Sequence, residues 1–171
     1  MITDATLDDI RRRTWPAATV FARLALAAGF LAAVADRFGL LGEKGTGNVS
    51  WGNMDNFMAY SHSLTPYLPD VLADVAGWGG TVAEIVFGIA LLLGIATRWV
   101  ALGSLGLLLV FGVSMFFALG WQAPLSFSVF GAAAAAALLA LAPARAYVLG
   151  IDQALSSRAS GGWPVADQRA G

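Results

Sequence analysis

The chain has 171 residues, of which 58% are hydrophobic and 12% charged, and its formal net charge is −1. This composition lacks the polar surface that a soluble domain needs and predicts an all-α membrane protein. With no cysteine and one histidine, the sequence excludes disulfides, thiol chemistry, cysteine-ligated clusters and multi-histidine metal sites, so we expect no metal. The low net charge also argues against nucleic acid as a partner.

The N-terminal region predicts one membrane-spanning helix. Residues 1–15 are polar and are expected to form a cytoplasmic segment, whereas Pro16 suits the first turn of a helix. The apolar run that follows predicts a transmembrane helix over 16–38. The same run, ending in Ala33-Val34-Ala35, also has features of a cleaved secretory signal, but Arg23 inside it and the later apolar segments disfavour that alternative.

The connection over 39–70 is polar and is expected to lie on the outer side of the membrane. Asn53 is suited to cap a short amphipathic helix over about 53–63. This helix is flanked by amphipathic rings of the kind that lie at headgroup level, those of Trp51, Tyr60 and Tyr67. We therefore predict an interfacial helix that lies across one end of the bundle.

Three further transmembrane helices are predicted over 71–97, 99–119 and 126–147, followed by a disordered cytoplasmic tail over 148–171. The expected architecture is a four-transmembrane-helix antiparallel bundle. Most Lys and Arg residues then fall on one side, and only Arg37 and Lys44 on the other. The excess of positive charge predicts that both termini are cytoplasmic.

The second predicted span carries a polar group on a face of small residues. One helical face is shared by six residues that recur at spacings of three and four: Gly77, Gly80, Glu84, Gly88, Leu91 and Ile95. Small residues let helices approach closely in lipid. An acid at this depth costs at least ~2.5–3.5 kcal/mol, so Glu84 is expected to face protein or water.

Two arginines of the first span are candidate partners of Glu84. Side chains lean toward the N-terminus of their own helix, which favours Arg37 as the partner and leaves Arg23 as the alternative. The candidate intramembrane polar site comprises Glu84, Arg37, Asp36, Arg23 and His62, and no catalytic residue is asserted. The competing interpretation is that these charges only fix helix register, with Arg23 reaching the interface, Asp36 solvated and His62 an ordinary loop residue.

Aromatic residues near the outer ends of the spans are candidate walls of a pocket beside this site. Ligand sites typically combine apolar walls with a few convergent polar groups. The candidate walls are Phe57, Trp78, Phe116, Phe117 and Trp121.

Several short motifs between Phe21 and about Leu141 match a known family of small membrane proteins. They are Arg23-Leu24 with Phe30, Glu84 with Gly88, Leu91-Leu92-Leu93-Gly94-Ile95-Ala96-Thr97-Arg98, Ala35-Asp36-Arg37-Phe38-Gly39, Trp51-Gly52-Asn53 and Ala123-Pro124-Leu125. On these motifs the chain resembles the DoxX family. The resemblance implies a four-span protein of the bacterial inner membrane, and a subunit of a quinone-linked oxidoreductase complex.

Two classes of function follow. In the first, a quinone binds in the polar pocket and a redox partner protein carries electrons, because the chain itself encodes no redox centre or other cofactor. The alternative is a non-enzymatic membrane scaffold, a lipid or small-molecule binder, or a transport component. Four short helices leave little room for a transport path unless the protein forms an oligomer. A co-purifying quinone would favour the first class.

Overall fold

The computed structural model describes residues 3–151 and 153–154, and within these residues the protein is all-helical, with no strand. Three helices are long and apolar enough to cross a membrane: Thr6–Arg37, Asp70–Leu93 and Thr97–Leu119. The elements in chain order are α1 (Asp4–Arg37), α2 (Met54–Leu64), α3 (Asp70–Leu93), α4 (Thr97–Leu119), α5 (Gln122–Ser126), α6 (Val129–Leu141) and the 3₁₀ helix η1 (Ala144–Ala146).

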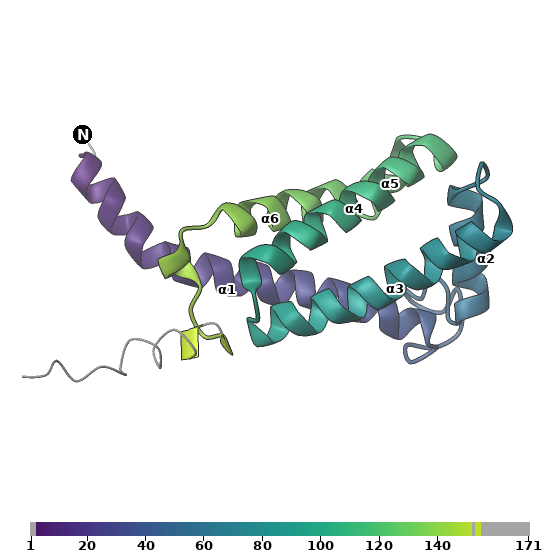
Figure 1. Ribbon diagram of the computed structural model, residues 1–171, viewed down its shortest axis with the longest axis horizontal. Coiled ribbons are helices and arrows are strands. Elements are labelled where there is room, and N and C mark those ends of the chain that lie inside the picture. Colours follow the sequence, from purple (N-terminus) through teal and green to yellow (C-terminus); the bar gives the residue numbers. More distant parts are fainter. Residues whose placement is uncertain (1–2, 152, 155–171) are drawn as a thin grey trace, which may run out of the picture.

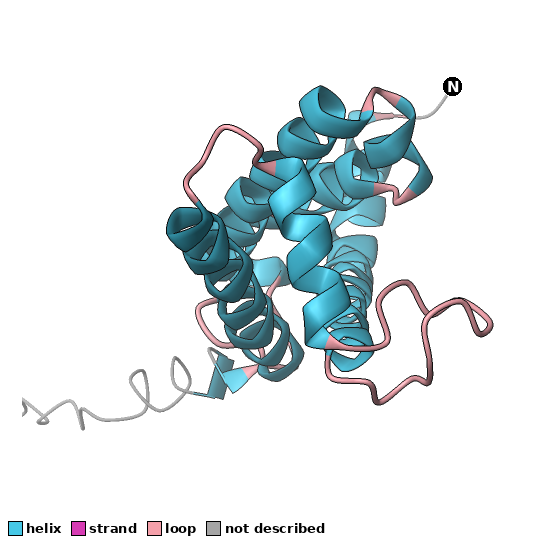
Figure 2. Ribbon diagram, turned by 90° about the vertical axis from the view of Figure 1, so that its right-hand side faces the viewer, coloured by secondary structure: helices cyan, strands magenta, loops and turns pink. Residues whose placement is uncertain are grey.

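The long helices pack in pairs. In Figure 1, α1 lies along α3, and α4 lies along α6. The two pairs also contact each other, α3 with α4 and α1 with α6. The short helix α2 stands across the end of this arrangement at which α1 ends and α3 begins (Figures 1 and 2). We call this the α2 end, and the opposite end, beyond which α1 projects, the terminal end.

The first helix begins at Asp4, whereas the sequence analysis placed its start at Pro16. Local interactions stabilise the additional turns. The Thr3 side chain caps the helix, and Asp9 forms an ion pair with Arg13 one turn further on. The polar segment before Pro16 is thus helical, and Pro16 lies inside α1 and not at its start.

The glycines of α3 allow three other helices to pack closely against it, which agrees with the close packing predicted for this face. A Cβ on Gly77 would lie 2.7 Å from a methionine sulfur of α2, and one on Gly80 would lie 2.9 Å from a phenylalanine ring of α4. A Cβ on Gly88 would lie 3.0 Å from a leucine side chain of α1. All three glycines are buried, as is Glu84 on the same face. The predicted face is thus the contact surface of α3 as far as the buried Leu91, whereas Ile95 lies beyond the end of the helix and is exposed.

Two helix ends differ from the predicted ranges. Gly94 adopts the left-handed conformation, with φ of 66°, so α3 ends at Leu93 and not at residue 97. The apolar segment predicted over 126–147 is divided, because Ser128 is left-handed and Pro143 cannot continue a helix. Its longest helical part is α6, with 13 residues, and η1 forms a separate turn after it. Most of the tail predicted over 148–171 lies outside the described residues.

Candidate functional site

Arg37 at the end of α1 and Glu84 in the middle of α3 form a buried ion pair. Nη1 of Arg37 lies 2.5 Å from Oε2 of Glu84, and the two side chains are 3% and 5% exposed. The same Nη1 donates a hydrogen bond of 2.9 Å to Oγ1 of Thr81, which itself donates to the carbonyl of Gly77. The structure joins Glu84 to Arg37, the partner that side-chain direction favoured. Thr81 was not predicted as a site residue, although it precedes Glu84 by three residues on the same helical face.

Three polar atoms around this pair lack hydrogen bonds. Nε of Arg37, Oε2 of Glu84 and the hydroxyl of Tyr60 are buried and have no hydrogen-bond partner within the described part of the chain. Oε2 of Glu84 is engaged by its ion pair with Nη1 of Arg37, so the two unpaired donors of the cluster are Nε of Arg37 and the hydroxyl of Tyr60. Burial also raises the pKa of the Tyr60 hydroxyl, which keeps it protonated as a donor at neutral pH. An unpaired buried group costs about 1–3 kcal/mol, so this cluster has unused capacity to bind a polar group.

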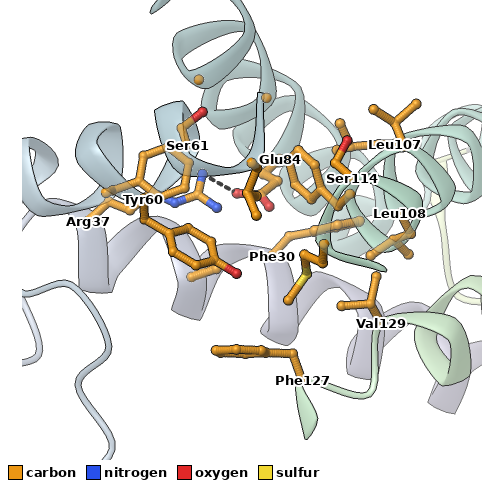
Figure 3. A pocket seen from close by; sticks show the side chains of 18 of the residues that line it. Phe30, Arg37, Tyr60, Ser61, Glu84, Leu107, Leu108, Ser114, Phe127 and Val129 are labelled. Atoms are coloured by element: carbon orange, nitrogen blue, oxygen red, sulfur yellow. Dashed lines mark ion pairs between the residues drawn. The ribbon is translucent and has the colours of Figure 1, made fainter. Parts of the chain in front are cut away.

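A cavity of about 540 Å³ lies beside these groups. Arg37, Glu84 and Tyr60 line it from the α2 end, and its remaining walls are mainly apolar. Figure 3 shows Arg37 and Glu84 on one side of this space and Phe127 and Val129 on the other. The Tyr60 hydroxyl points into the space between them. A few polar groups at one end of an apolar cavity are the arrangement that an amphipathic ligand requires.

The cavity reaches the surface of the protein along α1. Ala25 and Gly29 of α1 line the cavity and are exposed, and Phe127, just before α6, shares both properties. A Cβ placed on Gly29 would meet no atom within 4 Å. We call this region, defined by Ala25, Gly29 and Phe127, the α1 opening. The three residues that define it are apolar or small.

Of the aromatic residues predicted as pocket walls, Phe57 lines the cavity. The other four do not line it, and their side chains are exposed: Trp78, Phe116 and Phe117 on helices, and Trp121 in the turn between α4 and α5. Two of them, Trp78 and Phe116, directly follow the buried residues Gly77 and Met115. A step of one residue rotates a side chain by about 100° around a helix, which turns these rings away from the interior.

Asp36 does not face the cavity and instead organises the loop between α1 and α2. Its carboxylate accepts hydrogen bonds from the backbone N–H groups of Ser50 at 2.8 Å, Trp51 at 3.2 Å and Gly52 at 2.7 Å. Gly52 has φ of 68°, and a Cβ there would lie 2.5 Å from the backbone nitrogen of Lys44. Asp36 is thus a structural residue that fixes the loop beside the ion pair.

Arg23 belongs to the opposite end of the helices. Its guanidinium donates to the carbonyl of Leu91, near the end of α3, at 3.0 Å. It also donates to the carbonyls of Val148 at 2.8 Å and Leu149 at 3.1 Å, which tie the chain after η1 to α1 and α3. Through these contacts one side chain joins the last turn of α3 to the segment that follows η1. The residue is therefore buried, neither near Glu84 nor extended to the interface.

His62 lies outside the cavity and links α2 to α3. Its Nε2 lies 2.8 Å from Oδ1 of Asp74, and its Nδ1 lies 3.8 Å from Oδ1 of Asp70. In the described part of the chain, no group of three or more His, Cys, Asp or Glu side chains is placed to hold a metal ion.

A family comparison decides the affiliation of the chain. The family model described as methylamine utilisation protein MauE matches residues 13–124, more than half of the sequence. The chain belongs to the MauE family. With its three apolar helices of sufficient length, this MauE family member is a multi-pass membrane protein. Searches of curated proteins and of solved structures each found no match.

The family match overturns the resemblance to DoxX. The motifs that carried the resemblance are small residues at helix contacts, charged residues at helix ends and short turns. Membrane helices need these features for close packing and for termination, whatever their family. The prediction of a quinone-linked oxidoreductase rested on the resemblance to DoxX, so the sequence no longer supports it.

The part of the chain that matches MauE contains all the polar groups of the site. Residues 13–124 include Arg37, Tyr60, Thr81 and Glu84, whereas α6 lies beyond the match. The polar end of the cavity thus belongs to the family region, and α6 adds an apolar wall through Val129 and Ala132.

Proposed function

We propose that this MauE family member is a membrane protein that binds a neutral, carbonyl-bearing amphipathic molecule in the cavity between α1, α3, α4 and α6. The observation that carries the proposal is the buried Arg37–Glu84 pair with the unpaired Tyr60 hydroxyl at one end of an apolar cavity of about 540 Å³. The apolar part of the ligand would lie against Phe30 and Leu108, and its polar end would meet the ion pair.

The charge of the site favours a neutral ligand. Arg37 and Glu84 together have no net charge, so an anionic headgroup would be attracted by Arg37 and repelled by Glu84. The two unpaired donors are Nε of Arg37 and the hydroxyl of Tyr60. A carbonyl oxygen accepts hydrogen bonds without bringing a charge into the membrane, and it would satisfy these donors.

A quinone is one member of this ligand class, and the unpaired donors are the observation that favours it. Its ring carbonyls would accept from Arg37 or Tyr60, and an isoprenoid tail would leave through the α1 opening. In that case the protein is a subunit of a redox complex whose partner supplies electrons. A non-redox lipid or small-molecule binder uses the same contacts with an ester or amide carbonyl.

Methylamine itself is a poor ligand for this cavity, although the family description names methylamine utilisation. Methylammonium is a small cation that needs a free carboxylate or an aromatic cage. The carboxylate of Glu84 is already paired, and Arg37 beside it would repel a second cation. We therefore propose that any role in amine metabolism is exercised through the bound amphipathic molecule.

We further propose a four-span antiparallel topology in the bacterial inner membrane, with both termini cytoplasmic. At 1.5 Å per residue, α6 is only ~20 Å long, and the flanking α5 and η1 would complete its crossing of a core of about 30 Å. Arg11, Arg12, Arg98 and Arg145 lie toward the terminal end, which supports a cytoplasmic position for that end.

The experiment is to purify the protein from its native membrane, extract it with organic solvent and identify the extract by mass spectrometry and by its redox-sensitive absorption. Tyr60→Phe removes one unpaired hydroxyl, and Tyr67→Phe is the matched control because Tyr67 is exposed and does not line the cavity. We expect one carbonyl-bearing amphiphile in the extract of wild type. Its amount should be about 2- to 10-fold lower in Tyr60→Phe and unchanged in Tyr67→Phe. No bound amphiphile, or equal amounts in both variants and wild type, would overturn the proposal.

A further inference from the structure

A second hollow lies at the terminal end, far along α1 from the ion pair. The first turns of α1 run past the ends of the other helices (Figure 1). Beside them is a hollow of about 350 Å³, lined by Asp8, Arg11, Arg12 and Trp15 of α1 and by Arg145 of η1. Three of these five residues are arginines, so the hollow is positively charged overall.

The position of Arg145 in this hollow is fixed by tertiary contacts. The neighbouring Ala146 is fully buried, and its carbonyl accepts a hydrogen bond of 2.6 Å from the hydroxyl of Thr19 in α1. Thr19 follows Trp15 by four residues and Arg12 by seven, so these side chains lie along one face of α1. The fold therefore brings Arg145 to the face of α1 that carries Arg12 and Trp15.

The arginines of the terminal end fall into two groups. Arg23 and Arg98 donate to backbone carbonyls at the ends of α3 and α6. Arg11 lies 3.7 Å from Asp8, its neighbour in the hollow. Arg12 and Arg145 have no hydrogen bond or ion pair from their side chains within the described residues. The hollow thus presents guanidinium groups that the fold itself does not use.

The depth of the hollow matches the headgroup layer of a membrane. The apolar run 17–35 is ~28 Å long as a helix, close to the ~30 Å of a hydrocarbon core. Residues just before this run then lie at the level of lipid phosphates. Trp15 is the residue type that is enriched at this level.

We propose that Arg11, Arg12 and Arg145 bind the phosphate group of an anionic phospholipid, with Trp15 packed against the glycerol region. Arginine side chains present paired N–H donors that match phosphate oxygens, and unpaired guanidinium groups on two elements can hold one phosphate between them. This site is independent of the cavity ligand. It would tie the projecting start of α1 and the chain after α6 to one lipid.

The test measures thermal stability of the full-length protein in nanodiscs of phosphatidylcholine with increasing phosphatidylglycerol, and separately in phosphatidylcholine with inorganic phosphate. The site variant is Arg12→Gln with Arg145→Gln. The matched control is Arg13→Gln, because Arg13 is also exposed on this part of α1 but pairs with Asp9 and does not line the hollow.

We expect phosphatidylglycerol to stabilise wild type and Arg13→Gln, with an apparent affinity at least about tenfold weaker in the double variant. Inorganic phosphate should not reproduce the effect. Equal responses of the double variant and Arg13→Gln would indicate unspecific attraction and overturn the proposal. Stabilisation by inorganic phosphate but not by phosphatidylglycerol would overturn the assignment to lipid.

Discussion

The guanidinium carbon of Arg37 lies 3.7 Å from the centre of the Phe57 ring, so an aromatic side chain of α2 covers the buried charge at the end of α1. The ring of Trp51 lies 5.3 Å from the same carbon and packs edge-on against Phe57. Arg37 thus contacts Glu84 on one side and aromatic rings on the other. These contacts close the α2 end of the cavity and leave the α1 opening as a route for a ligand.

Replacing Phe57 should loosen α2 without unfolding the other helices. Phe57→Leu keeps an apolar side chain but removes the cation–π contact with Arg37, worth about 0.5–2 kcal/mol. Hydrogen exchange of the α2 amides should then become faster, whereas Phe57→Tyr, which keeps the aromatic face, should exchange like wild type. Unchanged exchange in Phe57→Leu would show that the ring does not hold α2 in place.

The charged pair should show strong energetic coupling. Arg37→Met leaves Glu84 buried without a partner, which costs about 3–5 kcal/mol for a buried pair. The double variant Arg37→Met with Glu84→Gln contains no unpaired charge and should regain most of the lost stability. Thermal unfolding in detergent of wild type, both single variants and the double variant measures the coupling. Additive effects would contradict the pairing.

Asp36→Asn should release the loop between α1 and α2. The carboxylate accepts from three backbone N–H groups, and each such bond to a charged acceptor contributes about 1.5–3 kcal/mol. We expect faster proteolysis within residues 40–50 while α3 and α4 stay protected. Glu43→Gln is the control, since it removes an exposed acid of the same loop. If both variants are cleaved at the same rate, Asp36 does not organise the loop.

Filling the α1 opening should exclude the ligand. A Cβ on Gly29 meets no atom within 4 Å, so Gly29→Leu should fold normally and project into the opening. Overpacking costs about 1–3 kcal/mol, which corresponds to about 5- to 150-fold weaker binding. Gly131→Leu is the control, because Gly131 in α6 is equally open but lies outside the cavity. The amount of co-purifying amphiphile is measured in both; equal amounts would argue against entry at Gly29.

The sequence predicted those features that depend on one helix or on the direction of neighbouring helices. The glycine face of α3 follows from residue spacing, and its contacts with three helices agree with that prediction. The choice of Arg37 over Arg23 followed from the lean of side chains on antiparallel helices. Both arguments use only the geometry that every α-helix shares.

Features that depend on the rotation of helices and on loop conformation were not predictable. The partners of Arg23 are carbonyls that come together only because the last turn of α3 and the chain after η1 both lie against α1. The N–H groups around Asp36 converge only in the folded loop. The exposed positions of Trp78 and Phe117 depend on the rotation of α3 and α4, which hydrophobicity cannot indicate when lipid and core are both apolar.

The most direct measurement is native mass spectrometry of the protein released from its own membrane, comparing wild type with Arg37→Met/Glu84→Gln. We predict a wild-type species carrying one bound neutral amphiphile, and a double variant that is folded but lacks it. A wild type without a bound molecule, or a double variant that retains the same molecule at the same occupancy, would contradict a ligand site at the Arg37–Glu84 pair.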